Sequence, residues 1–255
     1  MKIWAFDIET SPHFSAHFGR WKQNIPPEHT LIESEVICWA GKWIGEAKTD
    51  FMSSWDHGFE RMINGAWNKL DEADAVVHFN GKKFDVKRLN AEFIRLGWDA
   101  PSPYQQVDLL QQVKKNFAFS SNRLKHVLKE MGLTPKLEDN SNMQLWIDVV
   151  WNETKAAQER MRKYNIQDVK STEELYNWIL GWIQPHPNWG LFVDDMDAET
   201  KPICPNCGSL ALIKKGVETT NVRTYQRWKC KDCGKHSRGR KHIGLVGVDN
   251  GILKP

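Results

Sequence analysis

Residues 2–10 read KIWAFDIET, a short apolar run that ends in two carboxylates. The apolar part, residues 2–8, predicts a buried β-strand. Asp7 and Glu9 are two positions apart, so the repeat of a strand puts both side chains on one face of the sheet. Two carboxylates on one face of a buried strand are costly unless a cation lies between them. Oxygen ligands alone favour Mg²⁺ or Mn²⁺.

The pattern that follows predicts an α/β domain. We expect strands at 35–44, 47–53 and 75–79, and helices at 57–71 and 84–96. A short strand then reaches Asp108, and a helical pattern continues to about residue 183. Strands mixed with helices, followed by a helical run, indicate an α/β domain that ends near residue 190. The long connection 11–34 is either a functional loop or a surface loop whose aromatic side chains pack on the body.

A second acidic motif lies between a predicted strand and a predicted helix. It runs from Asn80 through Phe84 to Asp85, so that Asp85 falls near a helix start. An acid at this position can simply favour the N-terminus of the helix. It can also reach a metal site at the strand ends. Asp108 lies at the end of another strand, and we interpret it as a structural cap.

A third motif lies in the late helical region. Tyr164 and Asp168 are four positions apart and therefore one turn apart on the same side of a helix. By itself this spacing fits an ordinary solvated helix face. Together with Asp7, Glu9 and Asp85, however, it allows four carboxylates from separate segments to converge on two divalent ions. Two ions about 3.5–4 Å apart clamp the attacking and leaving oxygens of a phosphodiester.

These residues resemble the active-site set of the DEDD family of 3′→5′ exonucleases, in its tyrosine subclass: Asp7, Glu9, Asp85, Tyr164 and Asp168. Over nearly the full chain, the sequence is also similar to phage-encoded exonucleases that end in a zinc ribbon. The resemblance implies an α/β fold with an RNase H-like mixed five-stranded sheet flanked by helices. It also implies stepwise hydrolysis of terminal phosphodiesters, which we expect in single-stranded DNA.

The resemblance also implies individual roles. The four acids, Asp7, Glu9, Asp85 and Asp168, would bind two Mg²⁺ or Mn²⁺ ions. Tyr164 would position the attacking water, because a phenol with a pKa of about 10 is a weak base at neutral pH. Asn80 and Phe84 match the second motif of the family and would support the terminal nucleotide. We place Thr10 with them among the substrate-binding residues.

Four of the five cysteines form two CxxC pairs: Cys204 with Cys207, and Cys230 with Cys233. The pairs are separated by 22 residues, and each is followed by a glycine that permits a tight turn. This spacing predicts a tetrahedral site in which four cysteines bind one Zn²⁺. Because a closed four-cysteine site has no open position, we expect this zinc to be structural.

The region around the cysteines is strongly basic. Residues 201–242 contain eleven Lys or Arg and two acids, whereas the rest of the chain contains 24 Lys or Arg and 30 acids. A basic module on an acidic body predicts contact with a polyanion. We expect nucleic-acid contacts from Arg223, Arg227, Trp228 and Lys229. A solubilising surface or a protein-docking module is the alternative.

The expected organisation is therefore an exonuclease domain at 1–190, a linker at 191–201, a zinc ribbon at 202–243 and a tail at 244–255. The expected partner is nucleic acid, DNA in preference to RNA. The chain shows neither a signal peptide nor a membrane-length apolar run, so we expect it in the cytoplasm of a bacterium or phage-infected host cell.

Four other functions can be compared with this expectation. An RNase H-like structure-specific endonuclease or an exoribonuclease would share the acids of the first strand. A non-catalytic adaptor would use the zinc ribbon alone to bind nucleic acid. A zinc deaminase is excluded, because its HxE motif is missing: none of the nine histidines has Glu two residues later.

Overall fold

The computed structural model describes residues 1–255 except 20, 134–142, 193–201, 222 and 244–255. The chain divides into two compact units, Lys2–Tyr176 and Asn177–Pro255, with Met1 counted in the second. The division therefore falls earlier than residue 190, where the sequence pattern placed the end of the first domain.

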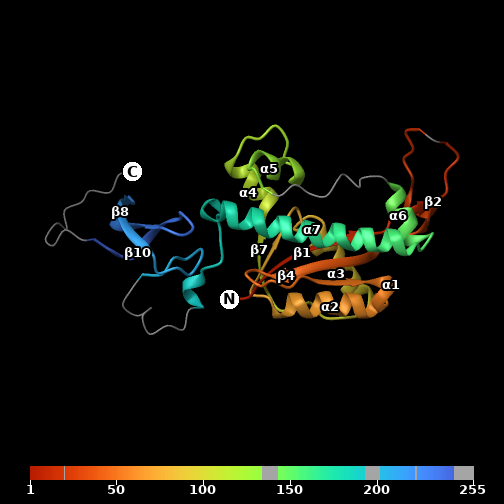
Figure 1. The fold of residues 1–255 in the computed structure, drawn as a ribbon, viewed down its shortest axis with the longest axis horizontal. Coiled ribbons are helices and arrows are strands. Elements are labelled where there is room, and N and C mark those ends of the chain that lie inside the picture. Colours follow the sequence, from red (N-terminus) through yellow and green to blue (C-terminus); the bar gives the residue numbers. More distant parts are fainter. Residues whose placement is uncertain (20, 134–142, 193–201, 222, 244–255) are drawn as a thin grey trace. The chain divides into compact units, whose positions relative to one another are not determined.

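Five strands form the central sheet of the first unit, in the order β5-β4-β1-β6-β7. Figure 1 labels β1, β4 and β7 of this sheet. The central strand β1, Ile3–Thr10, pairs antiparallel with β4, Val36–Trp43, and parallel with β6, Ala75–His78. Strand β5, Asp50–Ser53, adds to β4 in antiparallel orientation, and β7, Gln105–Asp108, adds to β6 in parallel. The predicted mixed five-stranded sheet is thus confirmed.

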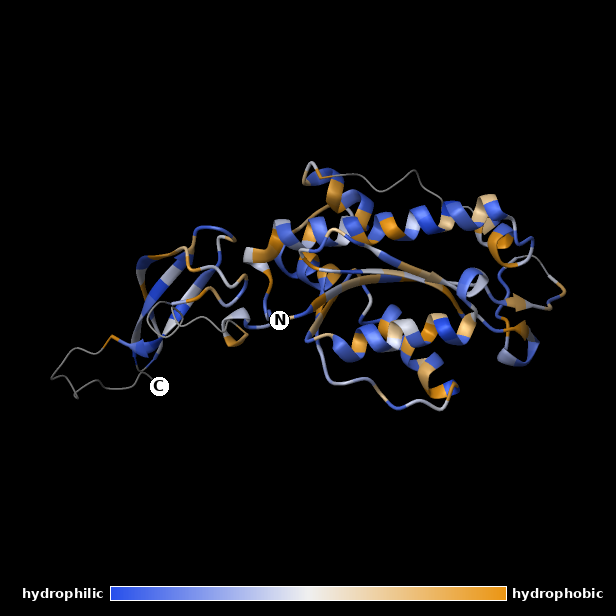
Figure 2. Cartoon of the chain, turned by 60° about the horizontal axis from the view of Figure 1, so that its bottom comes forward, coloured by the Kyte–Doolittle hydropathy of each residue, from blue (hydrophilic) through white to orange (hydrophobic). Residues whose placement is uncertain are grey.

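The alternation of side chains along β1 separates a core from the acidic positions. Trp4, Phe6 and Ile8 are buried in a core with side chains of α2, Phe59–Glu72, and α3, Asp85–Arg95. Asp7 and Glu9 occupy the intervening positions and face the other side of the sheet. That side is covered by α6, Met143–Val150, and α7, Lys155–Ile179. Figures 1 and 2 show α7 and α2 on opposite faces of the sheet.

Three shorter helices complete the first unit. Helix α1, Ser54–His57, precedes α2 and is separated from it by Gly58, whose φ of 79° lies in the left-handed region. The helix predicted at 57–71 therefore begins only at Phe59. Helix α4, Leu109–Asn116, follows β7 directly, and α5, Leu124–Glu130, comes next.

The connection 11–34 contains a small two-stranded sheet. Strand β2, Phe14–Ser15, pairs antiparallel with β3, Thr30–Ile32, which the 3-10 helix η1, Pro27–His29, precedes. Phe14 makes an edge contact with Trp151, with ring centroids 5.8 Å apart. Phe18 and Trp21, in contrast, are exposed. The connection therefore combines one aromatic side chain packed on another segment with others that project into solvent.

The second unit contains a three-stranded antiparallel sheet of order β10-β9-β8: β8 is Leu212–Thr219, β9 is Thr224–Cys230 and β10 is His236–His242. Two 3-10 helices precede it, η2, Leu180–Trp182, and η3, Trp189–Leu191.

Hydrogen bonds explain why the segment before the ribbon belongs to this second unit. Asn206 Nδ2 donates to the carbonyl of Leu180 at 2.8 Å, and Lys235 Nζ donates to the carbonyl of Ile183 at 2.8 Å. Leu180 begins η2 and Ile183 follows it, so the ribbon contacts residues that we expected in the nuclease domain.

Among the helices of the described residues, none has the combination of length and apolar character that crossing a bilayer requires.

Candidate active site and cysteine cluster

Three acids from opposite ends of the first unit meet beside the central strand. The ligating atoms of Asp7, Glu9 and Asp168 all lie within 4.8 Å of one another. Asp7 and Glu9 come from β1, whereas Asp168 lies on α7 and is only 4% exposed. The structure thus brings together residues from the first and third sequence motifs. Hard oxygen donors this close together can hold a divalent cation.

Asn165 links α7 to this acidic cluster. Its side chain is fully buried, and its Nδ2 donates hydrogen bonds to Asp7 Oδ2 at 2.8 Å and to the Asp7 carbonyl at 3.2 Å. Asn165 was not among the residues predicted from the sequence. The available signal was its position between Tyr164 and Asp168, where a polar residue sits next to the predicted site on a helix with a buried face.

Tyr164 lies beside the same cluster. Its ring makes an edge contact with Trp146, with centroids 6.4 Å apart, and packs against the core between α6, α7 and β4. It also lines the cleft into which Asp7 and Asp168 face. The aromatic contact fixes the ring and leaves part of the side chain accessible to a molecule in the cleft.

Asp85 lies close to β1 but outside the group of three acids. It is the first residue of α3 and is buried, and its Oδ1 accepts a hydrogen bond from the backbone N–H of Ile8 at 3.1 Å. Burial raises the pKa of Asp85 to about 6, against the lowering effect of this hydrogen bond, and the charge of Asp108 adds to the increase. Asp85 is thus held against the backbone between the two acids of β1.

Asp108 is the N-cap of α4, as the sequence predicted. Its Oδ1 accepts hydrogen bonds from the backbone N–H groups of Leu110 at 3.1 Å and Gln111 at 3.4 Å. The same oxygen accepts a hydrogen bond from the backbone N–H of Asn80 at 3.0 Å. Asn80 has a φ of 73°, in the left-handed region that asparagine tolerates better than most residues. Asp108 therefore stabilises the turn that carries the second motif.

A cleft of about 960 Å³ opens beside the acids. Asp7, Asn80, Tyr164 and Asp168 line one part of it. The remaining polar lining comes from the segment that leads into α5 and from α5 itself: Ser121, Asn122, Arg123, Lys125, His126 and Lys129. This basic part of the cleft was not expected from the sequence, because no motif marks it.

Two other residues expected to bind substrate are not part of the cleft lining. Thr10 ends β1, opposite Val36 and next to a register shift in the pairing with β4. Phe84 is 39% exposed at the start of α3, with the guanidinium of Arg88 5.7 Å from its ring centroid. Of the expected substrate-binding residues in the first unit, only Asn80 lines the cleft.

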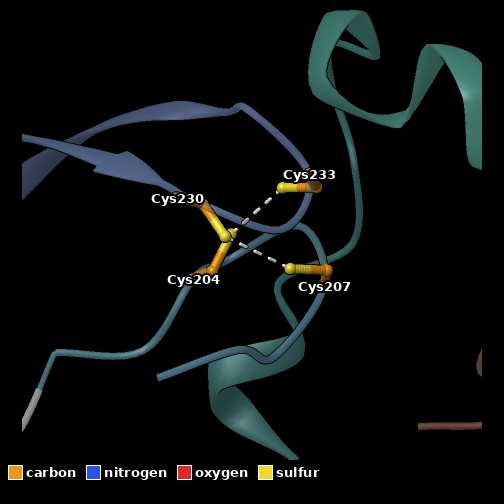
Figure 3. A group of neighbouring side chains, drawn as sticks. All are labelled: Cys204, Cys207, Cys230 and Cys233. Atoms are coloured by element: carbon orange, nitrogen blue, oxygen red, sulfur yellow. Dashed lines mark hydrogen bonds between the residues drawn. The ribbon is translucent and has the colours of Figure 1, made fainter. Parts of the chain in front are cut away.

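The four cysteines of the second unit converge, as Figure 3 shows. The Sγ atoms of Cys204 and Cys233 are 3.5 Å apart, and those of Cys207 and Cys230 are 3.6 Å apart. Zn–S bonds of about 2.3 Å in a tetrahedron place sulfur atoms about 3.8 Å apart. The cluster therefore has the size of a metal site with four thiolate ligands.

The thiols differ in their ionisation without a metal. Burial raises the pKa of Cys207 far above its usual value and that of Cys233 to about 11. Burial acts on Cys230 in the same direction, but hydrogen bonds from the backbone N–H groups of Cys233 and Asp232 outweigh it and lower the pKa. Backbone donors that favour a thiolate are suited to a metal ligand.

The basic and aromatic residues expected to bind nucleic acid lie on or next to β9. Trp228 lines a groove of about 680 Å³, together with Gln226 and the cations of β10, Arg238, Arg240 and Lys241. Arg227 and Lys229 alternate with Trp228 along the strand, and Arg227 Nε donates to the carbonyl of Lys215 at 2.9 Å. Arg223 is exposed in the turn between β8 and β9. The expected set is thus divided between the two faces of the sheet and its turn.

Comparison with known proteins identifies the class. The sequence model of the RNase H superfamily matches residues 33–180, more than half of the chain. The protein therefore belongs to the RNase H superfamily, and the match contains Asp85, Tyr164 and Asp168. Membership supports a nuclease-type function that acts on nucleic acid with divalent metal ions. No curated protein matches the chain.

Proposed function

We propose that this protein is a metal-dependent 3′→5′ exonuclease that releases 5′-mononucleotides from single-stranded DNA. The observation that carries the proposal is the cluster of Asp7, Glu9 and Asp168 at a cleft that Tyr164 also lines. Its chemistry agrees with the resemblance to the tyrosine subclass of DEDD exonucleases.

The donor set fits hard divalent cations. The three clustered side chains offer carboxylate oxygens only, which suit Mg²⁺ or Mn²⁺ better than softer metals. Asp85 lies outside the group and next to the backbone of Ile8. We therefore assign it to the binding of a second ion, either directly or through a water molecule bound to that ion. Such ions lower the pKa of a water molecule and stabilise the charge that develops on the phosphoryl oxygens.

The remaining residues act on the water and the substrate. Tyr164 is held by Trp146 and positions the attacking water through its hydroxyl group. Asn80 contacts the terminal nucleotide at the turn that Asp108 stabilises.

The cleft is large enough for a terminal nucleotide of a single strand. At about 960 Å³ it lies within the usual range for sites that bind small ligands, about 300–1,000 Å³. In the second unit we assign a structural Zn²⁺ to the four cysteines and additional strand binding to the basic groove beside Trp228.

The test is digestion of matched single-stranded and double-stranded DNA and RNA, each labelled at either end, with Mn²⁺ or without divalent cations. The proposal expects Mn²⁺-dependent shortening of single-stranded DNA from its 3′ end. Asp7→Asn and Asp168→Asn should abolish the release of mononucleotides. Glu159→Gln is the matched control, because Glu159 is an exposed acid on the same helix as Asp168.

Each alternative has its own outcome in this assay once a circular single strand is added to the substrates. Cleavage of a circular strand would indicate an endonuclease, and preference for the RNA substrate would indicate an exoribonuclease. Strand binding without any hydrolysis would indicate an adaptor. Equal nucleotide release by the wild type and by Asp7→Asn would overturn the assignment of the site.

A further inference from the structure

We propose that three cations beside the acidic site, Arg123, Lys125 and Lys129, form a wall that binds the phosphates of the nucleic-acid strand behind its terminal nucleotide. We call these three residues the cationic wall. The inference rests on the proposed function, and it identifies the part of the site that recognises a polynucleotide rather than a single nucleotide.

The first observation is the position of the wall. Its three side chains line the same cleft as Asp7, Tyr164 and Asp168. A strand whose last phosphodiester reaches the acids therefore lies in the same cleft as the wall. Because the acids attract divalent cations and repel phosphate, groups that attract the strand directly have to lie elsewhere in the cleft.

The second observation is how α5 presents these side chains. Leu124, Val127 and Leu128 are buried and anchor the helix, whereas Lys125 and Lys129 are exposed. These two lysines are four positions apart and so lie on the same side of the helix. Arg123 immediately precedes the helix and is also exposed. The helix thus buries its apolar residues and leaves its cations exposed at the cleft.

The third observation is the charge of the segment. Residues 109–129 contain five Lys or Arg and no Asp or Glu. This composition contrasts with the excess of acids over cations in the chain outside 201–242. Within the described parts of the chain, no ion pair involves Arg123, Lys125 or Lys129, so phosphates would not have to displace an internal partner.

The experiment compares two substrates of different length. The first is a short single-stranded oligonucleotide, and the second is the p-nitrophenyl ester of thymidine 5′-monophosphate, which has no upstream phosphate. Arg123→Gln and Lys129→Gln should each raise the KM for the oligonucleotide about fivefold to tenfold. Each should also reduce, by about one, the steepness of the plot of the logarithm of the binding constant against the logarithm of the salt concentration. Hydrolysis of the ester should remain within about twofold of the wild type, since the metal site is intact.

Lys114→Gln is the matched control, because Lys114 is an exposed lysine of the same basic segment that does not line the cleft. This variant should hydrolyse the oligonucleotide and the ester with the kinetics of the wild type. Unchanged oligonucleotide kinetics in both wall variants would overturn the inference. So would an equal loss on the ester and the oligonucleotide, since that would show damage to the reaction site itself.

Binding provides a readout that does not require cleavage. Fluorescence anisotropy of a labelled oligonucleotide should show weaker binding by the wall variants than by Lys114→Gln, and equal binding would contradict the wall. If the wild type hydrolysed neither substrate, the proposed exonuclease would fail, while the anisotropy result would still decide whether these cations bind a strand.

Discussion

The side-chain amide of Asn165 donates hydrogen bonds to both the carboxylate and the backbone carbonyl of Asp7, at 2.8 and 3.2 Å. These two bonds connect α7 to the central strand at a residue that lines the cleft. They fix the carboxylate of Asp7 relative to Asp168, which lies about one turn further along the same helix. Asn165 is therefore a positioning residue for the acidic cluster.

Asn165→Ala should lower hydrolysis roughly 10–100-fold, the usual cost of losing a partner that orients a metal ligand. It should also raise the Mn²⁺ concentration needed for half-maximal activity, which a loss of stability alone would not do. Mn²⁺ titrations of activity measure both effects. Gln167→Ala, on the same helix, is the control. An Asn165→Ala protein with wild-type Mn²⁺ dependence would show that the hydrogen bonds are only structural.

A buried ion pair should determine how firmly α7 binds the sheet. Lys42 of β4 pairs with Glu173 of α7, with side chains 9% and 15% exposed, and Glu173 also accepts a hydrogen bond from the backbone N–H of Gly45. Lys42→Met should lower the free energy of unfolding by about 3–5 kcal/mol, because it leaves a buried charge without its partner. Urea denaturation measures the loss.

An exposed ion pair on the same helix provides the comparison for this loss of stability: Lys163 Nζ lies 3.8 Å from Glu159 Oε1. Lys163→Met should lower the free energy of unfolding by less than about 1 kcal/mol, because exposed ion pairs usually contribute no more than that. If both substitutions had the same small effect, the pair of Lys42 and Glu173 would not be a main contact of α7.

The pKa of Asp85 predicts a pH dependence of stability in the absence of divalent cations. Its folded-state pKa of about 6 exceeds its ordinary value of 3.8, so the folded protein binds the proton more tightly than the unfolded chain. The stabilisation from this proton is therefore present at low pH and is lost as pH rises through about 6. From about pH 5 to pH 7.5, this group alone should lower the free energy of unfolding by roughly 1–2 kcal/mol.

Asp85→Asn isolates this contribution, because the amide cannot ionise. Denaturation of both proteins in Mg²⁺-free buffer should show a smaller decrease with pH for the variant. A parallel pH dependence in the two proteins would contradict the raised pKa. Addition of Mg²⁺ should stabilise the wild type most at the higher pH, where the carboxylate is ionised.

Metal analysis tests the cysteine cluster. We expect one Zn²⁺ per chain and a loss of bound zinc in Cys207→Ser, because a closed site needs all four thiolates. Zinc binding should release protons and weaken as pH falls, since thiols with raised pKa values must be deprotonated. Elemental analysis and a competing chelator measure these effects. Full zinc content in Cys207→Ser would exclude a site built from all four cysteines.

The sheet and part of the site could be predicted from the sequence because they follow short-range rules. The spacing of Asp7 and Glu9 fixes their common face on β1, and the spacing of Tyr164 and Asp168 does the same on α7. Asn165 and the cationic wall could not be found this way, since their roles depend on which distant segments meet in three dimensions. The start of the second unit at Asn177 depends on such contacts as well, because its hydrogen bonds to Leu180 and Ile183 have no sequence signature.

The tight approach of Gly181 to the cysteine loop has a consequence for truncation. A Cβ at residue 181 would lie 2.4 Å from the carbonyl oxygen of Cys233, so any larger residue would push the second CxxC loop away. Cutting the chain just before Cys204 would remove this packing and the hydrogen bonds that Asn206 and Lys235 make with the segment around Gly181. A catalytic fragment is therefore better ended near Tyr176, where the first compact unit ends, than near residue 201.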